Sequence, residues 1–296
     1  MAAARSAWLC AFCGQPGRPS REHILAQWMR DVVGPLPMER TTYSSGFDTI
    51  DDGRAYASVG ESVKVSRNSL LHQVTRTVCG VCNNGWMSRL ETAAKPILKD
   101  LLTARRDDQP RALPITEATV LARWAVKTSW TSELAGLGDQ NQEHAWMPAD
   151  MRQRLVVEDT PPATSWVWLA ACRDLNLCQQ LQATVVYDRT SPPTPGQEPR
   201  RILASGLIIN GLALLVYSFD HRAPFPPPLP APHGLRLWPS PSSVEFPPPP
   251  VTQQDLLLAI SQYGSWLPLH NRPFDHEAVG RARPGLVRQS HAAAAD

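Results

Sequence analysis

The sequence predicts an α+β fold, in which a cysteine-rich N-terminal unit precedes a unit with a helix packed on a small antiparallel sheet. Three observations favour this class. Apolar residues recur at helical spacing in two long stretches, an Asn-Gly pair separates two apolar runs, and 12 of the 29 prolines gather between Ala223 and Pro250. The chain has 296 residues, 43% of them hydrophobic and 19% charged, which suffices to bury a core of this kind.

The first unit is expected to span residues 1–110. A helix is predicted in the apolar stretch that ends at Gly34, and a polar, turn-rich stretch follows, with Asp52-Gly53 as a hairpin turn and weak strand character from Tyr56 to Val65. A longer helix is predicted from about Asn83 to Thr103. Its core-facing stripe is expected to consist of Trp86, Leu90, Ala94, Ile97 and Leu101.

A charged, proline-containing stretch, Ala104 to Pro114, separates this unit from a second α+β unit, residues 115–222. Here a helix is predicted from Thr116 to about Leu134, followed by four or five strands. The longest apolar run, Leu203 to Phe219, approaches the length of a membrane helix. Asn210-Gly211 at its middle favours a β-hairpin instead, because both central residues of a type I′ turn need positive φ.

The last segment, residues 223–296, is predicted to be extended. Runs such as PFPPPLPAP and FPPPP favour polyproline II, since proline donates no hydrogen bond to a sheet. A role for this tract as a ligand of a proline-binding partner, and so of the protein as a scaffold, remains an alternative.

Charge and targeting features limit the classes of function. Residues 1–113 contain 15 Lys and Arg against 11 Asp and Glu, a net of +4; since the whole chain carries +2, the remainder carries −2. The N-terminal part is therefore the more suitable partner for a polyanion. The first residues contain no apolar stretch of the length that a secretory signal needs, so we expect a cytoplasmic protein with no membrane partner.

Six cysteines in a reducing compartment are more often metal ligands or buried thiols than disulfides. Four of them form two Cys-x-x-Cys pairs, Cys10 with Cys13 and Cys79 with Cys82. Four thiolates around one tetrahedral zinc form a closed structural site, so these pairs predict one shared Zn²⁺. Cys172 and Cys178 are interpreted as buried free thiols, with a second metal site as the alternative.

Glu22-His23 follows the first pair by ten residues, and Asn83 follows the second pair directly. A shared zinc would bring these residues together at one side of the ion. The order Cys-x-x-Cys, Glu-His, Cys-x-x-Cys-Asn resembles the His-Me finger (HNH) nucleases, in particular their zinc-bound branch typified by phage endonuclease VII. The resemblance covers Cys10 to about Leu90 and implies a zinc-stapled ββα fold.

The resemblance also implies roles for single residues. His23 is expected to be the general base, and Glu22 and Asn83 are expected to bind a catalytic Mg²⁺ or Mn²⁺ while phosphodiester bonds of DNA are hydrolysed. Arg21 and Arg76, each next to one of these elements, are candidates for contacts to the DNA backbone. A homodimer is compatible with the sequence.

A non-catalytic zinc-binding module for DNA or protein is the alternative to this metal-dependent endonuclease. It requires Glu22, His23 and Asn83 to lie near the zinc by coincidence. The position of the His23 side chain, in a solvent-open pocket or in the core, distinguishes the two hypotheses.

Overall fold

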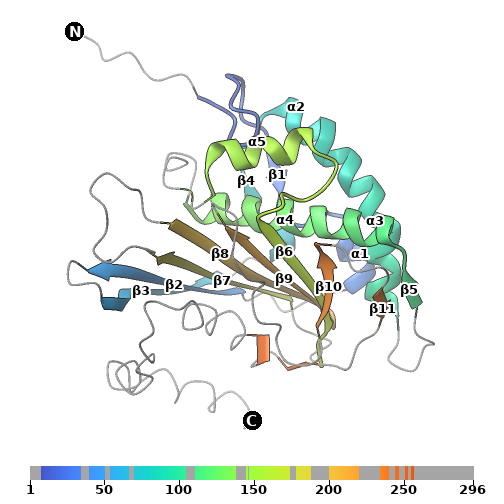
Figure 1. The fold of residues 1–296 in the computed structure, drawn as a ribbon. Coiled ribbons are helices and arrows are strands. Elements are labelled where there is room, and N and C mark those ends of the chain that lie inside the picture. Colours follow the sequence, from blue (N-terminus) through green and yellow to red (C-terminus); the bar gives the residue numbers. More distant parts are fainter. Residues whose placement is uncertain are drawn as a thin grey trace.

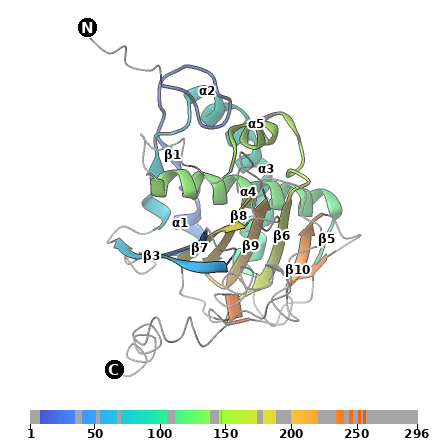
Figure 2. The same ribbon diagram turned by 60° about the vertical axis from the view of Figure 1, so that its left-hand side comes forward.

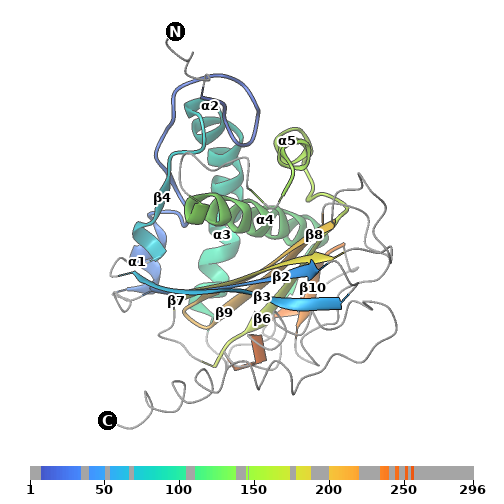
Figure 3. The same cartoon turned by 90° about the vertical axis from the view of Figure 1, so that its left-hand side faces the viewer.

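The computed structural model has its helices on one face of a large β-sheet (Figure 1). It describes residues 8–34, 40–50, 54–66, 70–104, 111–137, 145, 147–173, 178–187, 200–219, 234–239, 244–246, 251–252 and 255–256. Viewed along the sheet, α4 and α5 lie above the strands, whereas α1 and the end of α3 reach the level of the sheet (Figure 3). The mixed α+β class predicted from the sequence is therefore confirmed.

Within the described residues the main sheet has seven strands, in the order β10-β6-β9-β8-β7-β2-β3. Neighbouring strands are antiparallel, except that β2 and β7 run parallel. Two small antiparallel pairs, β1 with β4 and β5 with β11, complete the set. The strands are β1 (Glu22–His23), β2 (Arg40–Ile50), β3 (Arg54–Ser66), β4 (Val74–Thr75), β5 (Arg111–Leu113), β6 (Ser165–Ala171), β7 (Cys178–Tyr187), β8 (Arg200–Ile209), β9 (Leu212–Phe219), β10 (Leu235–Trp238) and β11 (Val244–Phe246).

The α-helices are α1 (Met29–Val33), α2 (Gly80–Cys82), α3 (Ser88–Thr103), α4 (Ile115–Leu137) and α5 (Ala149–Val157). A π-helical turn, Asn83–Met87, joins α2 to α3, and a 3₁₀ turn, Leu70–His72, precedes β4. The predicted helix from Asn83 to Thr103 thus exists, but its first turn is irregular. The five residues of its predicted stripe are all buried: Trp86, Leu90, Ala94, Ile97 and Leu101.

Helix α4 lies at the centre of the molecule, between the sheet and the segments that carry α2, α3 and α5 (Figure 2). Residues 121–134 are all buried, which is the pattern of a helix covered on every side. Trp130 donates a hydrogen bond from Nε1 to Ser218 Oγ on β9 at 2.9 Å. This helix was predicted from Thr116 to Leu134, and the structure confirms it with slightly longer bounds.

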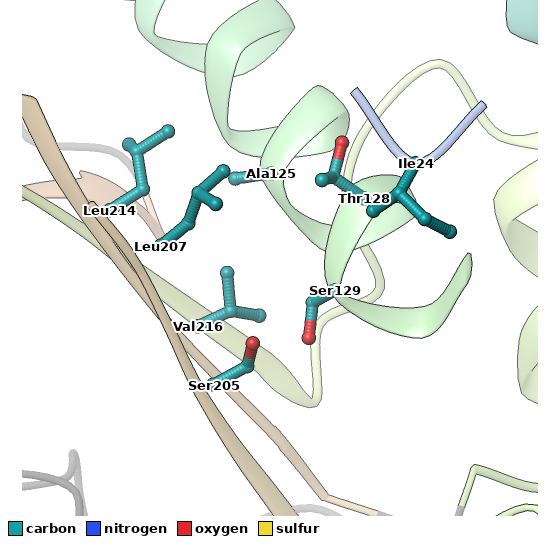
Figure 4. A pocket seen from close by; sticks show the side chains of 8 residues that line it. All are labelled: Ile24, Ala125, Thr128, Ser129, Ser205, Leu207, Leu214 and Val216. Carbon is teal, nitrogen blue, oxygen red and sulfur yellow. The ribbon is translucent and has the colours of Figure 1, made fainter. Parts of the chain in front are cut away.

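The contact between α4 and the sheet is close-packed. A cavity of only about 10 Å³ remains between Ala125, Thr128 and Ser129 of α4 and the side chains of β8 and β9 (Figure 4). Ile24, just after β1, closes the same cavity (Figure 4). Because protein interiors of this density resist displacement, the sheet fixes the position of α4.

The Asn-Gly hairpin is confirmed. Asn210 and Gly211 have φ of 46° and 83° and connect β8 to β9, as a type I′ turn requires. No helix in the described part of the chain is long and apolar enough to cross a membrane. The apolar run around this turn is therefore two neighbouring strands of the sheet.

The sheet is larger than the sequence indicated. The four strands β6 to β9 correspond to the predicted small antiparallel sheet, but the hairpin of β2 and β3 extends it through parallel pairing of Gly46 and Phe47 with Thr184 and Val185. Such pairing joins residues about 140 positions apart in the chain, and no local pattern indicates it. The predicted hairpin turn at Asp52-Gly53 lies outside the described residues.

The proline-rich tract also differs from its prediction. Two strands lie within it, β10 paired with β6 and β11 paired with β5. They occupy two of its stretches without consecutive prolines, where backbone N–H groups are available for a ladder. The prolines between residues 223 and 233 lie outside the described residues.

The predicted boundary, Ala104 to Pro114, is described only in part: residues 105–110 lie outside the described residues, and Arg111–Leu113 form β5. On both sides of it, buried residues belong to one hydrophobic cluster, which runs from Phe12 and Val78 through α3 and α4 to Leu214 of the sheet. The division into units at 1–110, 115–222 and 223–296 stays a prediction.

The hydrogen bond between Trp130 of α4 and Ser218 of β9 can be tested for its contribution to the stability of the fold. Replacing Ser218 with alanine leaves the buried indole N–H of Trp130 without its acceptor, so we expect a loss of about 1–3 kcal/mol in the free energy of unfolding. Chemical denaturation measures it. Thr116→Ala, at an exposed position of the same helix, should change stability by less than about 0.5 kcal/mol. Equal stabilities of the two variants would contradict this account.

Candidate metal centre and adjoining residues

The four predicted cysteines meet. The sulfur atoms of Cys10, Cys13, Cys79 and Cys82 all lie within 4.8 Å of one another. Cys13 Sγ and Cys79 Sγ are 3.8 Å apart, which is about the separation of two sulfurs on a tetrahedral zinc with Zn–S bonds of about 2.3 Å. The cluster therefore has the composition and the spacing of a structural zinc site.

Backbone hydrogen bonds bring the two cysteine pairs together. Ala11 N donates to Thr77 O at 2.9 Å, and Ser20 N donates to Val78 O at 2.8 Å. Gly14, with φ of 69°, closes the first turn after Cys13. Arg152 of α5 also donates from Nε to Ala11 O at 2.7 Å, so a segment from the second half of the chain supports the first cysteine loop.

Hydrogen bonds to sulfur favour the thiolate forms that zinc requires. Cys79 N donates to Cys10 Sγ at 3.3 Å, and Cys82 N donates to Cys79 Sγ at 3.4 Å. A hydrogen bond with Cys82 is the main cause that lowers the pKa of Cys10 to about 4, whereas the pKa of Cys82 is raised, first by the same contact. Without a cation, the negative charge of one sulfur thus opposes ionisation of the next, and a bound metal ion would remove this conflict.

Trp86 anchors the helix beside the cluster. Its ring lies 5.6 Å from the ring of Phe12, which belongs to the first cysteine loop, and the Arg123 guanidinium lies 5.5 Å from its centroid. The aromatic residue that follows the second cysteine pair therefore connects both cysteine loops to α4. This packing accounts for the tryptophan that follows the second cysteine pair.

Glu22 is buried and forms an ion pair. Its Oε1 lies 2.5 Å from Lys127 Nζ on α4, and Glu91 Oε1 on α3 lies 3.0 Å from the same nitrogen. The Lys127 side chain is 0% exposed, the Glu22 side chain 6% and the Glu91 side chain 25%. Burial lowers the pKa of Lys127, but the two carboxylates outweigh it and raise this pKa above its ordinary value. The lysine therefore stays an ammonium ion.

His23 lies on the opposite side of the same strand. It is half-buried, and its Nε2 lies 2.9 Å from the side-chain nitrogen of Gln27, which fixes the orientation of the ring. Burial lowers the pKa of His23, and the charges of Arg30 and Arg21 add to this effect. A neutral imidazole near the surface at cellular pH can accept a proton.

Asn83 begins the π-helical turn and faces the segment before β1. Its Nδ2 donates to Ser20 Oγ at 3.1 Å and to Arg21 O at 3.3 Å. Gly85, within this turn, has non-helical φ and ψ of −94° and −108°, so the chain kinks between α2 and α3. Asn83 lies before this kink and Glu91 after it.

Arg21 and Arg76 are both exposed. β1 and β4 are antiparallel with Glu22 opposite Thr75, so the two arginines lie at the same end of this strand pair. The structure brings these two predicted substrate-binding residues together.

The expected divalent-cation site does not fit this arrangement. Glu22 and Asn83 were predicted as its ligands, but Lys127 engages the Glu22 carboxylate, which is almost completely buried. While the ammonium of Lys127 is in place, a divalent cation at Glu22 would lie against a like charge. We therefore assign no chemical step to such an ion.

Sequence reasoning missed Glu91 and Lys127. Lys127 is a single charge between Trp124 and Trp130 on an apolar stretch, and a buried lysine in such a stretch requires anionic partners. That pattern indicates a paired charge, although it does not identify the partners.

Among the other predicted positions, Cys172 is buried and forms no disulfide, as expected. The side chain of Cys178 lies outside the described residues. Comparison with protein-family models, with curated proteins and with solved structures gave no match.

The cysteine cluster predicts one zinc ion per chain. Cys82→Ser should abolish zinc binding, because a neutral hydroxyl replaces a thiolate ligand. Elemental analysis of purified protein measures the zinc content. Cys172→Ser is the matched control, a buried cysteine outside the cluster that should leave the content unchanged. Zinc-free wild-type protein, or full zinc content in the Cys82 variant, would contradict the assignment.

Proposed function

We propose that this chain is a zinc-stabilised endonuclease of the HNH type, which hydrolyses phosphodiester bonds of DNA with His23 as the general base. The observation that carries the proposal is the attachment of the His23 strand to the helix that follows the second cysteine pair. Asn83 makes this attachment through Ser20 and Arg21, next to the cysteine cluster. The antiparallel pairing of β1 with β4 and the position of α3 after β4 support the implied ββα unit, although α1, β2 and β3 lie between its two strands in the chain.

The properties of His23 support its role. The ring is accessible in part, and its lowered pKa keeps it neutral at cellular pH. Its Nε2 accepts a hydrogen bond from the Gln27 amide, so this nitrogen takes a proton only when a water molecule replaces that amide. A neutral imidazole can remove a proton from a water molecule as the water attacks phosphorus. Arg21 and Arg76, at one end of the same strand pair, would contact the phosphates.

A non-catalytic zinc-binding module for DNA or protein is a second candidate. The ion pair of Glu22 with Lys127 favours it, because the pair removes the one anionic ligand expected for a catalytic metal ion. This module would bind DNA through the same arginines without cutting it. Nicking and binding measurements on the same protein separate the two functions.

Cleavage of supercoiled plasmid tests the catalytic proposal. We expect nicking by the zinc-loaded protein, measured without added divalent cation and with Mg²⁺ or Mn²⁺, and a loss of about 100-fold or more in His23→Ala, because general-base catalysis contributes about 10²–10⁴-fold. His72→Ala is the matched control, since His72 is an exposed histidine in a neighbouring turn.

Both variants should keep their zinc, because neither residue belongs to the cysteine cluster. An unchanged nicking rate in His23→Ala would reject His23 as the base. DNA binding without nicking by the wild-type protein would favour the module.

The two arginines give a prediction about binding alone. Arg21→Ala and Arg76→Ala should each weaken DNA binding and reduce the slope of log K against log salt by about 0.9, the value for one lost phosphate contact. Fluorescence anisotropy over a salt series measures this slope. Lys99→Ala, at an exposed position near the end of α3, should leave it unchanged. Equal slopes in all these proteins would exclude the arginines from the DNA contact.

A further inference from the structure

Three charged side chains from three separate elements meet beneath His23. β1 provides Glu22, α3 provides Glu91, and α4 provides Lys127, whose nitrogen lies 2.5 Å and 3.0 Å from one oxygen of each carboxylate. The two glutamates are 69 positions apart in the sequence. Lys127 is fully buried on α4, and its neighbours Ala125, Thr128 and Ser129 face the sheet.

A cation at this position is an electrostatic requirement. Two carboxylates near each other in a poorly solvated place repel, and each raises the free energy of the other's ionised form. A positive charge between them removes this cost. Either an ammonium ion or a metal ion can supply the charge, since oxygen atoms of carboxylates are also the ligands that Mg²⁺ and Mn²⁺ prefer.

We propose that Lys127 occupies the position of a divalent cation between Glu22 and Glu91, and that it thereby blocks a metal site which these two carboxylates would otherwise form. The ammonium and a divalent cation exclude each other, because both would contact the same oxygen atoms and carry like charges. Lys127 is a positioning residue here: it is fully buried and holds the strand of His23 against α3 and α4.

This inference deepens the proposed function, because it concerns the residue expected to bind the catalytic metal ion. It implies that His23 acts beside an internal ammonium and not beside a metal ion held by Glu22. The experiment below measures metal binding and not DNA cleavage. A failure of this inference is therefore distinguishable from a failure of the nuclease proposal.

The test uses the full-length, zinc-loaded chain and Mn²⁺ as the probe. Lys127→Met has a side chain of similar length without the charge, and it leaves the two carboxylates facing each other. We expect this variant to bind one Mn²⁺ ion. The loss of the free-ion signal in electron paramagnetic resonance measures this binding. Wild-type protein should show no Mn²⁺ binding that depends on Glu22. Adding Glu22→Gln to the Lys127→Met variant should weaken binding by at least about tenfold.

A second readout is thermal stability. Mn²⁺ should raise the melting temperature of Lys127→Met but not that of wild-type protein, because a ligand stabilises only the state that binds it. A matched control, in which Lys127→Met is combined with Glu22→Gln and Glu91→Gln, keeps the shapes and removes all three charges. It should fold and should not respond to Mn²⁺.

Several results would overturn the proposal. Mn²⁺ binding by wild-type protein that Glu22→Gln abolishes would show that Lys127 does not block the site. A folded Lys127→Met variant that does not bind Mn²⁺ would show that the two carboxylates form no metal site. If this variant folds neither with nor without Mn²⁺ while the triple variant folds, the metal ion cannot replace the ammonium. Folding of Lys127→Met only in the presence of Mn²⁺ would support the proposal.

Discussion

The convergence of four sulfur atoms in one small volume is the constraint on which the candidate site depends. Cys10 and Cys79 belong to segments that are 69 positions apart. Backbone hydrogen bonds join the two loops, and Phe12 and Val78 are buried in the core, so a metal ion held by the four sulfurs would add a cross-link to contacts that already exist. The same convergence brings Ser20 and Arg21 to Asn83.

The buried ammonium extends this constraint into the core. Breaking a buried ion pair by removing one partner is strongly unfavourable, because it leaves an uncompensated charge. Lys127 therefore ties the short strand β1 to α4, and α4 is in turn fixed by its contact with the sheet. The sheet consequently positions a half-buried histidine that lies outside it. This coupling gives the second half of the chain a role in the site even though none of its residues was expected there.

The sequence was informative where the determinants are local. The spacing of the cysteine pairs predicted their cluster, the period of Trp86, Leu90 and Ala94 predicted the buried face of α3, and Asn210-Gly211 predicted a turn that needs positive φ. The helix face and the turn each depend on residues within a few positions of each other, and each cysteine pair is local as well. The two pairs are 69 positions apart, but their matched spacing predicts that they share one ion.

Features that depend on distant partners were not predictable in this way. The parallel contact of β2 with β7 and the ion pairs of Lys127 join segments that are separated by at least 36 positions, and many alternative pairings satisfy the same local patterns. The strands β10 and β11 were missed for a different reason. The prolines dominate the composition of their tract, although each strand occupies three or four residues free of proline.

The Glu-His pair shows how backbone geometry limits an inference from residue order. Successive side chains of a strand point to opposite faces, so Glu22 and His23 cannot both face the same pocket while β1 stays extended. The structure follows this rule: Glu22 and Thr75, which are paired, are buried, whereas His23 and Val74 are only half-buried. An acidic residue directly before a histidine therefore identifies a shared metal and base site only if the backbone turns between them. Here Glu22 forms a buried ion pair, whereas His23 lies near the surface. The catalytic hypothesis therefore depends on His23 and its exposed neighbours rather than on Glu22.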